Sequence, residues 1–318
     1  MRLLTSLPAL ILLCALTVIS CARGPSDDRP ATRSVPDSSG ISDWLEIRAD
    51  KESDHPGFFI QMADPQLGMS GSPLWLALFG ATWNDDAFQA DAKLFERAIA
   101  HANELEPAFV VICGDLVNRV GHAGQIAEFQ RIAATLKPSI PLYLVAGNHD
   151  VGNTPTGESL RAYREIFGPD WYSFRQGDVY GIVLNSQLID APDDVPGEAA
   201  KQLAWLREEL IRANSSGAQH LLVFQHQSYF LEIPDEADQY FNIDEGSRAV
   251  YLGLLKKSGV EAVFAGHYHR NSYGRDENLE MITTGPVGRP LGEDPSGFRI
   301  VEIGKDSLRH EYFALLQP

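Results

Sequence analysis

One short stretch, residues 110–118, constrains the fold more than any other part of the chain. It reads Val-Val-Ile-Cys-Gly-Asp-Leu-Val-Asn, an apolar run that opens with β-branched residues and ends at Gly114-Asp115. A run of this kind predicts a buried strand. Open α/β sheets bind ligands outside the carboxyl ends of their strands, so Asp115 is a candidate site residue. Taken alone, the carboxylate fits a cap on the following turn equally well.

The same arrangement recurs at four other predicted strand ends. Strand 58–63 ends at Asp64, and strand 141–146 runs into Gly147-Asn148-His149-Asp150. Strands 220–224 and 260–265 run into His226 and into Gly266-His267-Tyr268-His269. Because each preceding run is apolar, each polar group should be delivered to one rim of the core.

Helical periodicity separates the first three of these strands. Apolar residues recur at helical spacing between residues 88 and 102 and between residues 125 and 136. Strands that alternate with helices indicate a parallel sheet with right-handed crossovers. The pattern also predicts helices at 159–167, 199–213 and 247–257, a hairpin at 171–185, and a closing antiparallel sheet built from 281–284, 298–303 and 310–315.

The residue types at the five strand ends indicate a metal centre. Carboxylate, amide oxygen and imidazole ligands suit Zn, Mn or Fe. Six or more ligands are too many for one tetrahedral ion, so they favour two ions that share a bridging carboxylate. A two-metal centre of this kind can clamp a phosphoryl group and turn water into a nucleophile at neutral pH.

These blocks resemble the calcineurin-like metallophosphoesterases, whose pattern is D-x-H, G-D-x-x-[DN], G-N-H-[DE], a lone His and G-H-x-H. The resemblance runs from about residue 58 to the C-terminus. It implies an α/β metallophosphatase-type β-sandwich, with two mixed sheets flanked by helices, and a centre of two divalent or trivalent ions (Mn, Fe or Zn). The Asp64-Pro65-Gln66 block and the Trp-containing loop after it resemble a Ser/Thr protein phosphatase branch of the family.

The resemblance implies a metal-ligand set. Asp115 would bridge both ions, Asp64 and His269 would hold the first ion, and Asn148, His226 and His267 would hold the second. Gln66 stands where most members have His. An amide oxygen binds such metals less strongly than imidazole does, so Gln66 either completes the first site weakly or turns away from it.

The resemblance also implies residues that would handle the substrate. His149 would contact the phosphate and act as the acid toward the leaving oxygen, with Asp150 as its orienting carboxylate. Asn118 would support a phosphate oxygen or the Asn148 loop. Arg119 is a phosphate candidate because a guanidinium matches a phosphate fork, although it could equally pair with a surface carboxylate.

The N-terminus has the pattern of a targeting segment. After Met1-Arg2 comes an almost wholly apolar run, and Val18-Ile19-Ser20-Cys21 resembles a bacterial lipobox. We predict a lipoprotein signal peptide at 1–20, a flexible tether at 21–45 and one metallophosphoesterase domain at 46–318. A lipid on Cys21 would anchor the exported protein to a bacterial membrane, on the periplasmic or cell-surface side. An uncleaved membrane helix is the alternative.

Charge and motif together predict the function. The formal net charge of −17 argues against nucleic-acid binding through a basic face. We expect a metal-dependent phosphoric ester hydrolase, a phosphomonoesterase acting on a small phosphorylated molecule or on phosphoprotein Ser/Thr. The alternatives are a phosphodiesterase acting on nucleotides or lipids, and a non-catalytic, metal-bound lipoprotein. His149 argues against the last alternative, because it has no metal to hold.

Overall fold

The structure is a computed structural model that describes Ile41 and residues 57–71 and 88–315. The residues from 57 onward that it describes belong to one compact unit, Val35–Pro318. The predicted signal peptide, Cys21, the tether apart from Ile41, and most of the Trp-containing loop lie outside the described residues, and the domain start at residue 46 stays a prediction. None of the described helices is both long and apolar enough to cross a membrane.

The first sheet contains the strand that ends at Asp115. Its order is β11-β10-β1-β2-β3, and its strands are β1 Gly57–Met62, β2 Val110–Cys113, β3 Leu142–Val145, β10 Gly297–Ile303 and β11 Leu308–Ala314. Strands β1, β2 and β3 run parallel, as the sequence predicts. Strands β10 and β11 extend the sheet antiparallel beyond β1. The sheet is therefore mixed, and the carboxyl ends of its three parallel strands share one edge.

The second sheet has the order β4-β5-β6-β7-β9-β8. Its strands are β4 Tyr172–Gln176, β5 Val179–Val183, β6 His220–Phe224, β7 Ala262–Ala265, β8 Ser272–Asp276 and β9 Leu279–Thr283. The four central strands β5, β6, β7 and β9 are parallel. The edge strands β4 and β8 each form an antiparallel hairpin with their neighbour.

The prediction of one closing antiparallel sheet is wrong. Strand β9 pairs parallel with β7 in the second sheet, and only β10 and β11 close the first sheet. Hydrophobic periodicity identifies a strand but does not say which sheet the strand joins. The partner of β9, the polar strand β8, has the sequence Ser-Tyr-Gly-Arg-Asp, which carries no apolar alternation.

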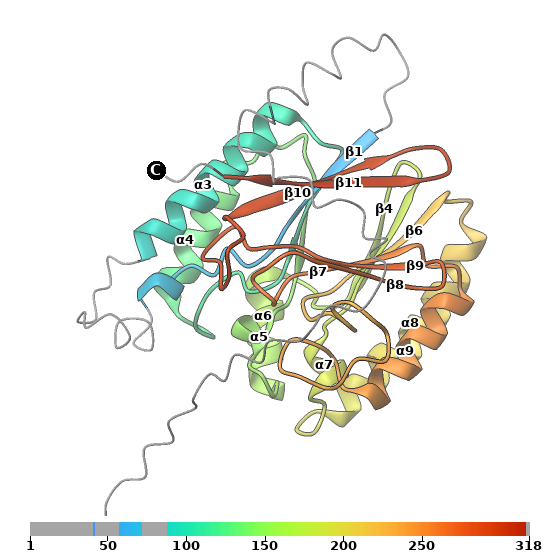
Figure 1. Cartoon of the computed structure of the whole chain (residues 1–318). Coiled ribbons are helices and arrows are strands. Elements are labelled where there is room, and N and C mark those ends of the chain that lie inside the picture. The colour runs from blue at the N-terminus through green and yellow to red at the C-terminus, as the bar shows by residue number, and fades with distance from the viewer. Residues whose placement is uncertain (1–40, 42–56, 72–87, 316–318) are drawn as a thin grey trace, which may run out of the picture. The chain divides into compact units, whose positions relative to one another are not determined.

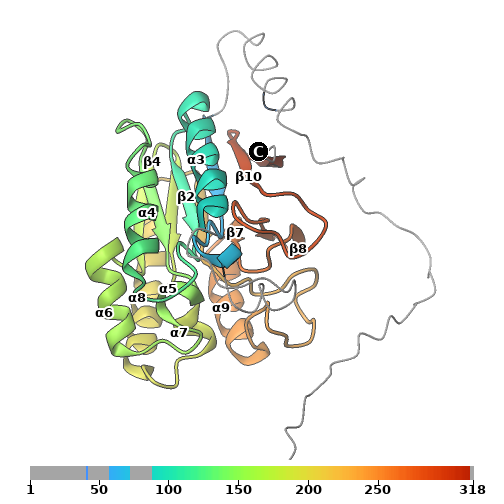
Figure 2. The same cartoon turned by 90° about the vertical axis from the view of Figure 1, so that its left-hand side faces the viewer.

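Helices α3 Phe88–Leu105 and α4 Ala123–Ala133 are the two crossovers between the parallel strands of the first sheet, and they lie side by side (Figures 1 and 2). Helix α3 buries Ala92, Phe95, Ile99 and Ala102, the stripe that the sequence predicts. The His122 side chain caps α4 by accepting a hydrogen bond from the backbone N–H of Gln125. The remaining helical segments are η1 Met69–Gly71, α5 Asn148–Val151, α6 Gly157–Phe167, α7 Gln187–Asp190, α8 Pro196–Ser215 and α9 Glu245–Lys257.

Strand alternation divides the core into three apolar layers. On β1, Ile60 and Met62 pack with α3 and α4, whereas Phe59 faces the second sheet and contacts Phe224 and Phe264. A third cluster joins the second sheet to α8 and α9. Two mixed sheets packed face to face, with helices outside both, confirm the predicted fold class.

Both sheets deliver their parallel strand ends to one place. The backbone N–H of Asp64 donates to the carbonyl of Gly114 at 3.1 Å, and that of Gly266 donates to the carbonyl of His226 at 2.9 Å. Between the sheets, Nδ1 of the His226 ring contacts the carbonyl of Cys113 at 2.8 Å. The ends of β1 and β2 thus meet the ends of β6 and β7, where the candidate ligands lie.

Candidate metal centre

One group of candidate ligands comprises Asp64, Asp115 and His269. Each offers one ligand atom, and these atoms all lie within 4.8 Å of one another. All three residues are buried. Nε2 of His269 lies 3.4 Å from a carboxylate oxygen of Asp64. Such close, buried carboxylates need a cation or protons between them, because unpaired buried charge is costly.

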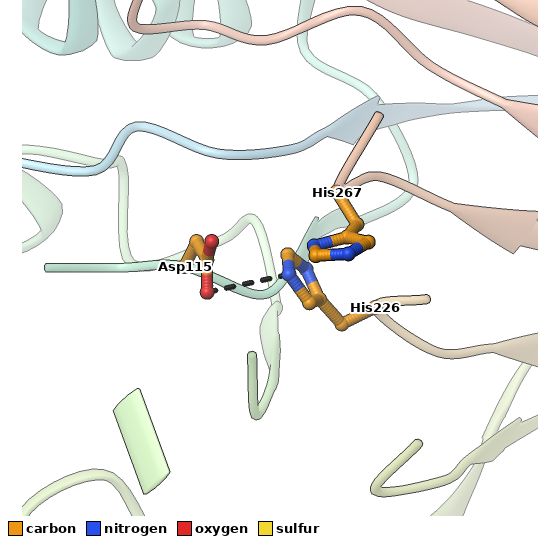
Figure 3. Close-up of side chains that lie close together, drawn as sticks. All are labelled: Asp115, His226 and His267. Carbon is orange, nitrogen blue, oxygen red and sulfur yellow. Dashed lines mark ion pairs between the residues drawn. The ribbon is translucent and has the colours of Figure 1, made fainter. Parts of the chain in front are cut away.

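The second group comprises Asp115, His226 and His267, again with ligand atoms within 4.8 Å of one another. Figure 3 shows the carboxylate of Asp115 directed toward the two rings, with Nε2 of His226 at 3.3 Å. The side-chain oxygen of Asn148 lies 2.9 Å from the same Nε2 atom. Asp115 belongs to both groups, which is the position that a bridging carboxylate requires.

Backbone carbonyls set the orientation of the three histidine rings. Because a carbonyl only accepts, the ring nitrogen that faces it must carry the proton. Nδ1 of His226 faces the Cys113 carbonyl at 2.8 Å, Nε2 of His267 faces the Tyr240 carbonyl at 3.0 Å, and Nδ1 of His269 faces the Arg289 carbonyl at 2.6 Å. In each neutral ring the other nitrogen is left as a ligand atom, an arrangement that metal-binding histidines commonly have.

The protonation equilibria of the second group reflect its need for positive charge. Burial by itself disfavours the imidazolium of His226, but the carboxylates of Asp115 and Asp64 outweigh burial and raise its pKa to about 9. Burial likewise opposes ionisation of Asp115, yet the neighbouring histidines hold the pKa of its carboxyl below its usual range. Burial and the charge of His226 lower the pKa of His267 to about 4. The proton that His226 retains therefore lies where a metal cation would be equally favourable.

The backbone at the ligand residues is unusual. Seven non-glycine residues in the described parts of the chain have positive φ, and five of them are predicted ligands: Asp64, Gln66, Asp115, His267 and His269. Their φ values lie between 37° and 67°. Each such residue costs of the order of 1–3 kcal/mol, so it persists only where the surrounding structure enforces it. Strain concentrated in this way marks a functional site.

The residues fit a pair of metal ions. The side chain of Gln66 is buried, with 2 % of its surface exposed, and its Oε1 atom has no hydrogen-bond partner among the described residues. A buried carbonyl oxygen without a donor is suited to bind a cation. Carboxylate, imidazole and amide groups are also ligands that Mn, Fe or Zn accept.

His149 lies at the edge of the ligand groups and is half-buried. Its backbone N–H donates to a carboxylate oxygen of Asp115 at 2.8 Å. Its Nδ1 faces the backbone carbonyl of Asn118 at 2.7 Å, so Nδ1 carries the proton of the neutral ring. Arg119, the next predicted substrate residue, is exposed at the surface beside Asn118.

The prediction that Asp150 orients the His149 ring is wrong. The carboxylate of Asp150 accepts hydrogen bonds from the backbone N–H groups of Leu116, Val117 and Gly147 at 2.9–3.2 Å. It therefore holds the loop after Asp115 against the loop that carries Asn148 and His149. The Asn118 carbonyl orients the ring instead. His149 and Asp150 are successive residues of helix α5, and successive helical side chains point in different directions.

Two residues that the sequence analysis did not select support the site. Asp91 on α3 is buried and accepts hydrogen bonds from the backbone N–H groups of Gly68 and Ser70, just after Gln66. In the sequence, Asp91 could have been recognised as a carboxylate on the apolar face of an amphipathic helix. Tyr240 has its hydroxyl 3.4 Å from Nδ2 of Asn148 and accepts from His267 through its carbonyl. Tyr240 lies in an irregular segment, and no sequence pattern marks it.

Two glycines of the predicted motifs provide space for the ligands. A Cβ atom on Gly114, where φ is +81°, would lie 2.5 Å from Nδ1 of His226. A Cβ atom on Gly147 would lie 2.2 Å from the backbone nitrogen of Asp115 and 2.3 Å from its Oδ1. Gly147 itself has φ −108°, which any residue can adopt. Only the close approach of Asp115 requires a glycine there.

Together, the fold and the two ligand groups that share one carboxylate define a metal-dependent phosphoesterase with a dinuclear centre. The chain belongs to the calcineurin-like phosphoesterase family, whose model matches residues 58–271. It is 37% identical over 276 residues to the human protein named serine/threonine-protein phosphatase CPPED1, covering 84% of this chain and 87% of the human one. These matches confirm the predicted family and its Ser/Thr phosphatase branch.

Solved structures show the same fold. A dimetal phosphatase from Danio rerio matches with a TM-score of 0.61 and 14% identity, covering 81% of this chain and 96% of that one. The purple acid phosphatase PPD1 from yellow lupin seeds matches with a TM-score of 0.59 and 14% identity, covering 82% of this chain and 52% of that one. At this identity the likeness concerns the fold alone, and it agrees with the predicted β-sandwich.

Replacing Gly147 by Ala should weaken metal binding without unfolding the protein. The new methyl group would press against a backbone atom of Asp115, which cannot move aside as a flexible side chain can. We expect the metal affinity to fall about 10- to 100-fold, the range for changes behind metal ligands. Metal titration of the purified variant measures this. Gly197→Ala is the matched control, because its Cβ would meet nothing within 4 Å. Equal metal affinity in both variants would contradict the spacing argument.

Proposed function

We propose that this protein is a phosphomonoesterase that removes phosphate from Ser and Thr residues of proteins. The observation that carries the proposal is the place of Asp115 in both ligand groups, beside a histidine whose Nδ1 is fixed by the Asn118 carbonyl. The relatives named as Ser/Thr protein phosphatases support the substrate class, because the match spans most of both chains.

We assign the seven predicted ligands to two ions. When bound, the ions supply positive charge that polarises the phosphoryl oxygens and makes water nucleophilic at neutral pH. Asp115 would bridge the two ions. Asp64, Gln66 and His269 would hold the first ion, and Asn148, His226 and His267 would hold the second. Oε1 of Gln66 has no hydrogen-bond partner in the described part of the chain, which supports its assignment as a ligand. The carbonyl contacts of the three histidines leave one nitrogen of each neutral ring for the metals.

The proton needed by the leaving group comes from His149. The Asn118 carbonyl fixes the proton on Nδ1, so Nε2 can carry the second proton and give it to the ester oxygen as the P–O bond breaks. Asn118 thus acts on the substrate through His149. The exposed guanidinium of Arg119 meets an incoming phosphate, whose geometry matches its fork of donors. Asp150 positions the loops that carry Asp115 and His149.

The metal-free protein, reloaded with Mn, Zn or Fe, should hydrolyse p-nitrophenyl phosphate faster than bis(p-nitrophenyl) phosphate, and it should release phosphate from phosphoserine peptides. Asp115→Asn should lower kcat by at least a hundredfold and reduce the bound metal, because both ions lose their shared ligand. Asp178→Asn, a change of an exposed carboxylate, is the control. Diester preference would instead indicate a phosphodiesterase of nucleotides or lipids. Bound metal without any turnover would indicate a non-catalytic protein.

His149→Ala should keep both ions and lose activity in proportion to how poor the leaving group is. An alkyl alcohol needs a proton to depart, whereas p-nitrophenolate needs little help. We expect a loss of about 10²–10⁴-fold on phosphoserine peptides and a much smaller loss on p-nitrophenyl phosphate. Measurements of kcat on both substrates, together with analysis of the bound metal, test this prediction. An equal loss on both substrates would reject the role of His149 as the acid.

We also propose that the protein is exported and anchored by lipid on Cys21, on the strength of the lipobox-like Val-Ile-Ser-Cys and the apolar run before it. Cys21→Ser should leave the protein unlipidated, so membrane fractions and metabolic labelling with a fatty acid test it. Cys14→Ser, within the predicted signal peptide, is the matched control and should keep the label. A labelled Cys21→Ser protein would refute the anchor, and an unlabelled, membrane-retained one would indicate an uncleaved helix.

A further inference from the structure

A cavity of about 480 Å³ opens beside the second ligand group. Such a volume falls within the range of small-ligand sites. His267 forms part of its wall, so a molecule with its phosphate at the metal centre can extend into it. The wall residues that matter here are Asp190, Gln227, Asp238, Tyr240, Asp244 and His267.

Gln227 places an unsatisfied acceptor in this cavity wall. Its side chain is buried, with 3 % of its surface exposed, and its Oε1 has no hydrogen-bond partner among the described residues. The amide orientation follows from its neighbours. Nε2 faces the carbonyls of Asn242 and Tyr240 at 3.1 and 3.5 Å, and a carbonyl cannot face another acceptor. The buried oxygen therefore requires a donor from elsewhere.

Carboxylates add negative charge to the same wall. Three aspartates line the cavity, and none of its described lining residues is Lys or Arg. Asp238 is paired with Arg248 at 3.2 Å, and Asp244 caps the start of α9 through the backbone N–H of Ser247. Asp190 forms no ion pair with a described residue; its carboxylate accepts hydrogen bonds from the Gln227 side chain and, at 3.3 Å, from the backbone N–H of Asp244. Among the described residues, no positively charged side chain therefore pairs with it.

Tyr240 connects the cavity to the metal centre. The residue is 58 % exposed, although its ring lies beside Phe241 and His267, its carbonyl faces His267 and its hydroxyl lies near Asn148. An exposed aromatic face beside carboxylates attracts ammonium and guanidinium groups. An acceptor with no donor among the described residues, a carboxylate with no ion pair there and an aromatic face have a common ligand, which is a cation rich in N–H groups.

We propose that this cavity binds the ammonium or guanidinium of a Lys or Arg residue close in sequence to the phosphorylated residue of the substrate. The inference rests on the proposed function, because it assigns a sequence preference to a protein phosphatase. Asp190 forms an ion pair with the cation, Gln227 Oε1 accepts one of its N–H groups, and the ring of Tyr240 covers it. Phosphate and cation together then hold the substrate at two points.

The test compares phosphoserine peptides that differ at one position, scanned on both sides of the phosphoserine, with Lys, Gln or Glu at that position. We expect kcat/KM of the full-length metal-loaded protein to be roughly tenfold higher for the best Lys peptide than for its Gln counterpart, as one charge-assisted hydrogen bond provides. Asp190→Asn should reduce this Lys/Gln ratio to near one. Asp193→Asn removes the same charge from an exposed neighbour and should keep the ratio.

Tyr240→Leu is a second variant, chosen because an exposed ring can be replaced without unfolding, and it should also lower the Lys/Gln ratio. Equal rates for Lys and Gln peptides at every position, or an unchanged ratio in Asp190→Asn, would overturn the inference.

A failure of the proposed function gives a different result, in which the protein hydrolyses p-nitrophenyl phosphate but does not hydrolyse any phosphopeptide. In that case phosphoethanolamine is compared with glycerol phosphate. Faster hydrolysis of phosphoethanolamine that depends on Asp190 would support the cation site, and equal rates for the two esters would refute it.

Discussion

The structure depends on keeping one carboxylate, that of Asp115, charged inside the protein. An ionised group removed from water is costly unless opposite charge and hydrogen bonds compensate it. Here His226 supplies charge from the second sheet, and the backbone N–H of His149 donates from the loop after β3. The glycine at 147 lets these groups come close. The two sheets are therefore joined at this end by polar contacts, and along their length by aromatic packing around Phe59.

The frame around the ligands is built mainly from backbone hydrogen bonds. The loops after β1 and β2 continue the pairing of their strands, since Gln66 N–H donates to the Asp115 carbonyl and Leu67 bridges to Val117. Asp91 and Asp150, both buried, hold these loops by accepting hydrogen bonds from their backbone N–H groups. Left-handed backbone at the ligands is unfavourable in isolation, and this frame enforces it. A site for two ions requires rigidly placed ligands, because the distance between the ions sets how far apart the ligands must lie.

Much of this arrangement could be predicted from the sequence, for a physical reason. Apolar runs that lead to Asp64, Asp115 and His226 predict both a buried strand and the polar residue at its end. Parallel strands bring such ends together. What could not be predicted depends on contacts between distant segments. The sheet to which β9 belongs, the partner of Asp150 and the place of Tyr240 are decided by packing, and local periodicity contains no information about it. The cavity beside His267 is missed for the same reason, since its walls come from loops with no regular pattern.

The ligands come from widely separated parts of the chain. The carboxylate of Asp64 accepts a hydrogen bond from the backbone of His267, 203 residues later, and the two residues follow strands of different sheets. A nascent chain that has not yet produced β7 offers neither ion its full set of ligands, so metal capture must come late in folding. Ions that bind only the finished structure also draw the folding equilibrium toward it. The supply of metal thus contributes to the fraction of the protein that is folded, in addition to its activity.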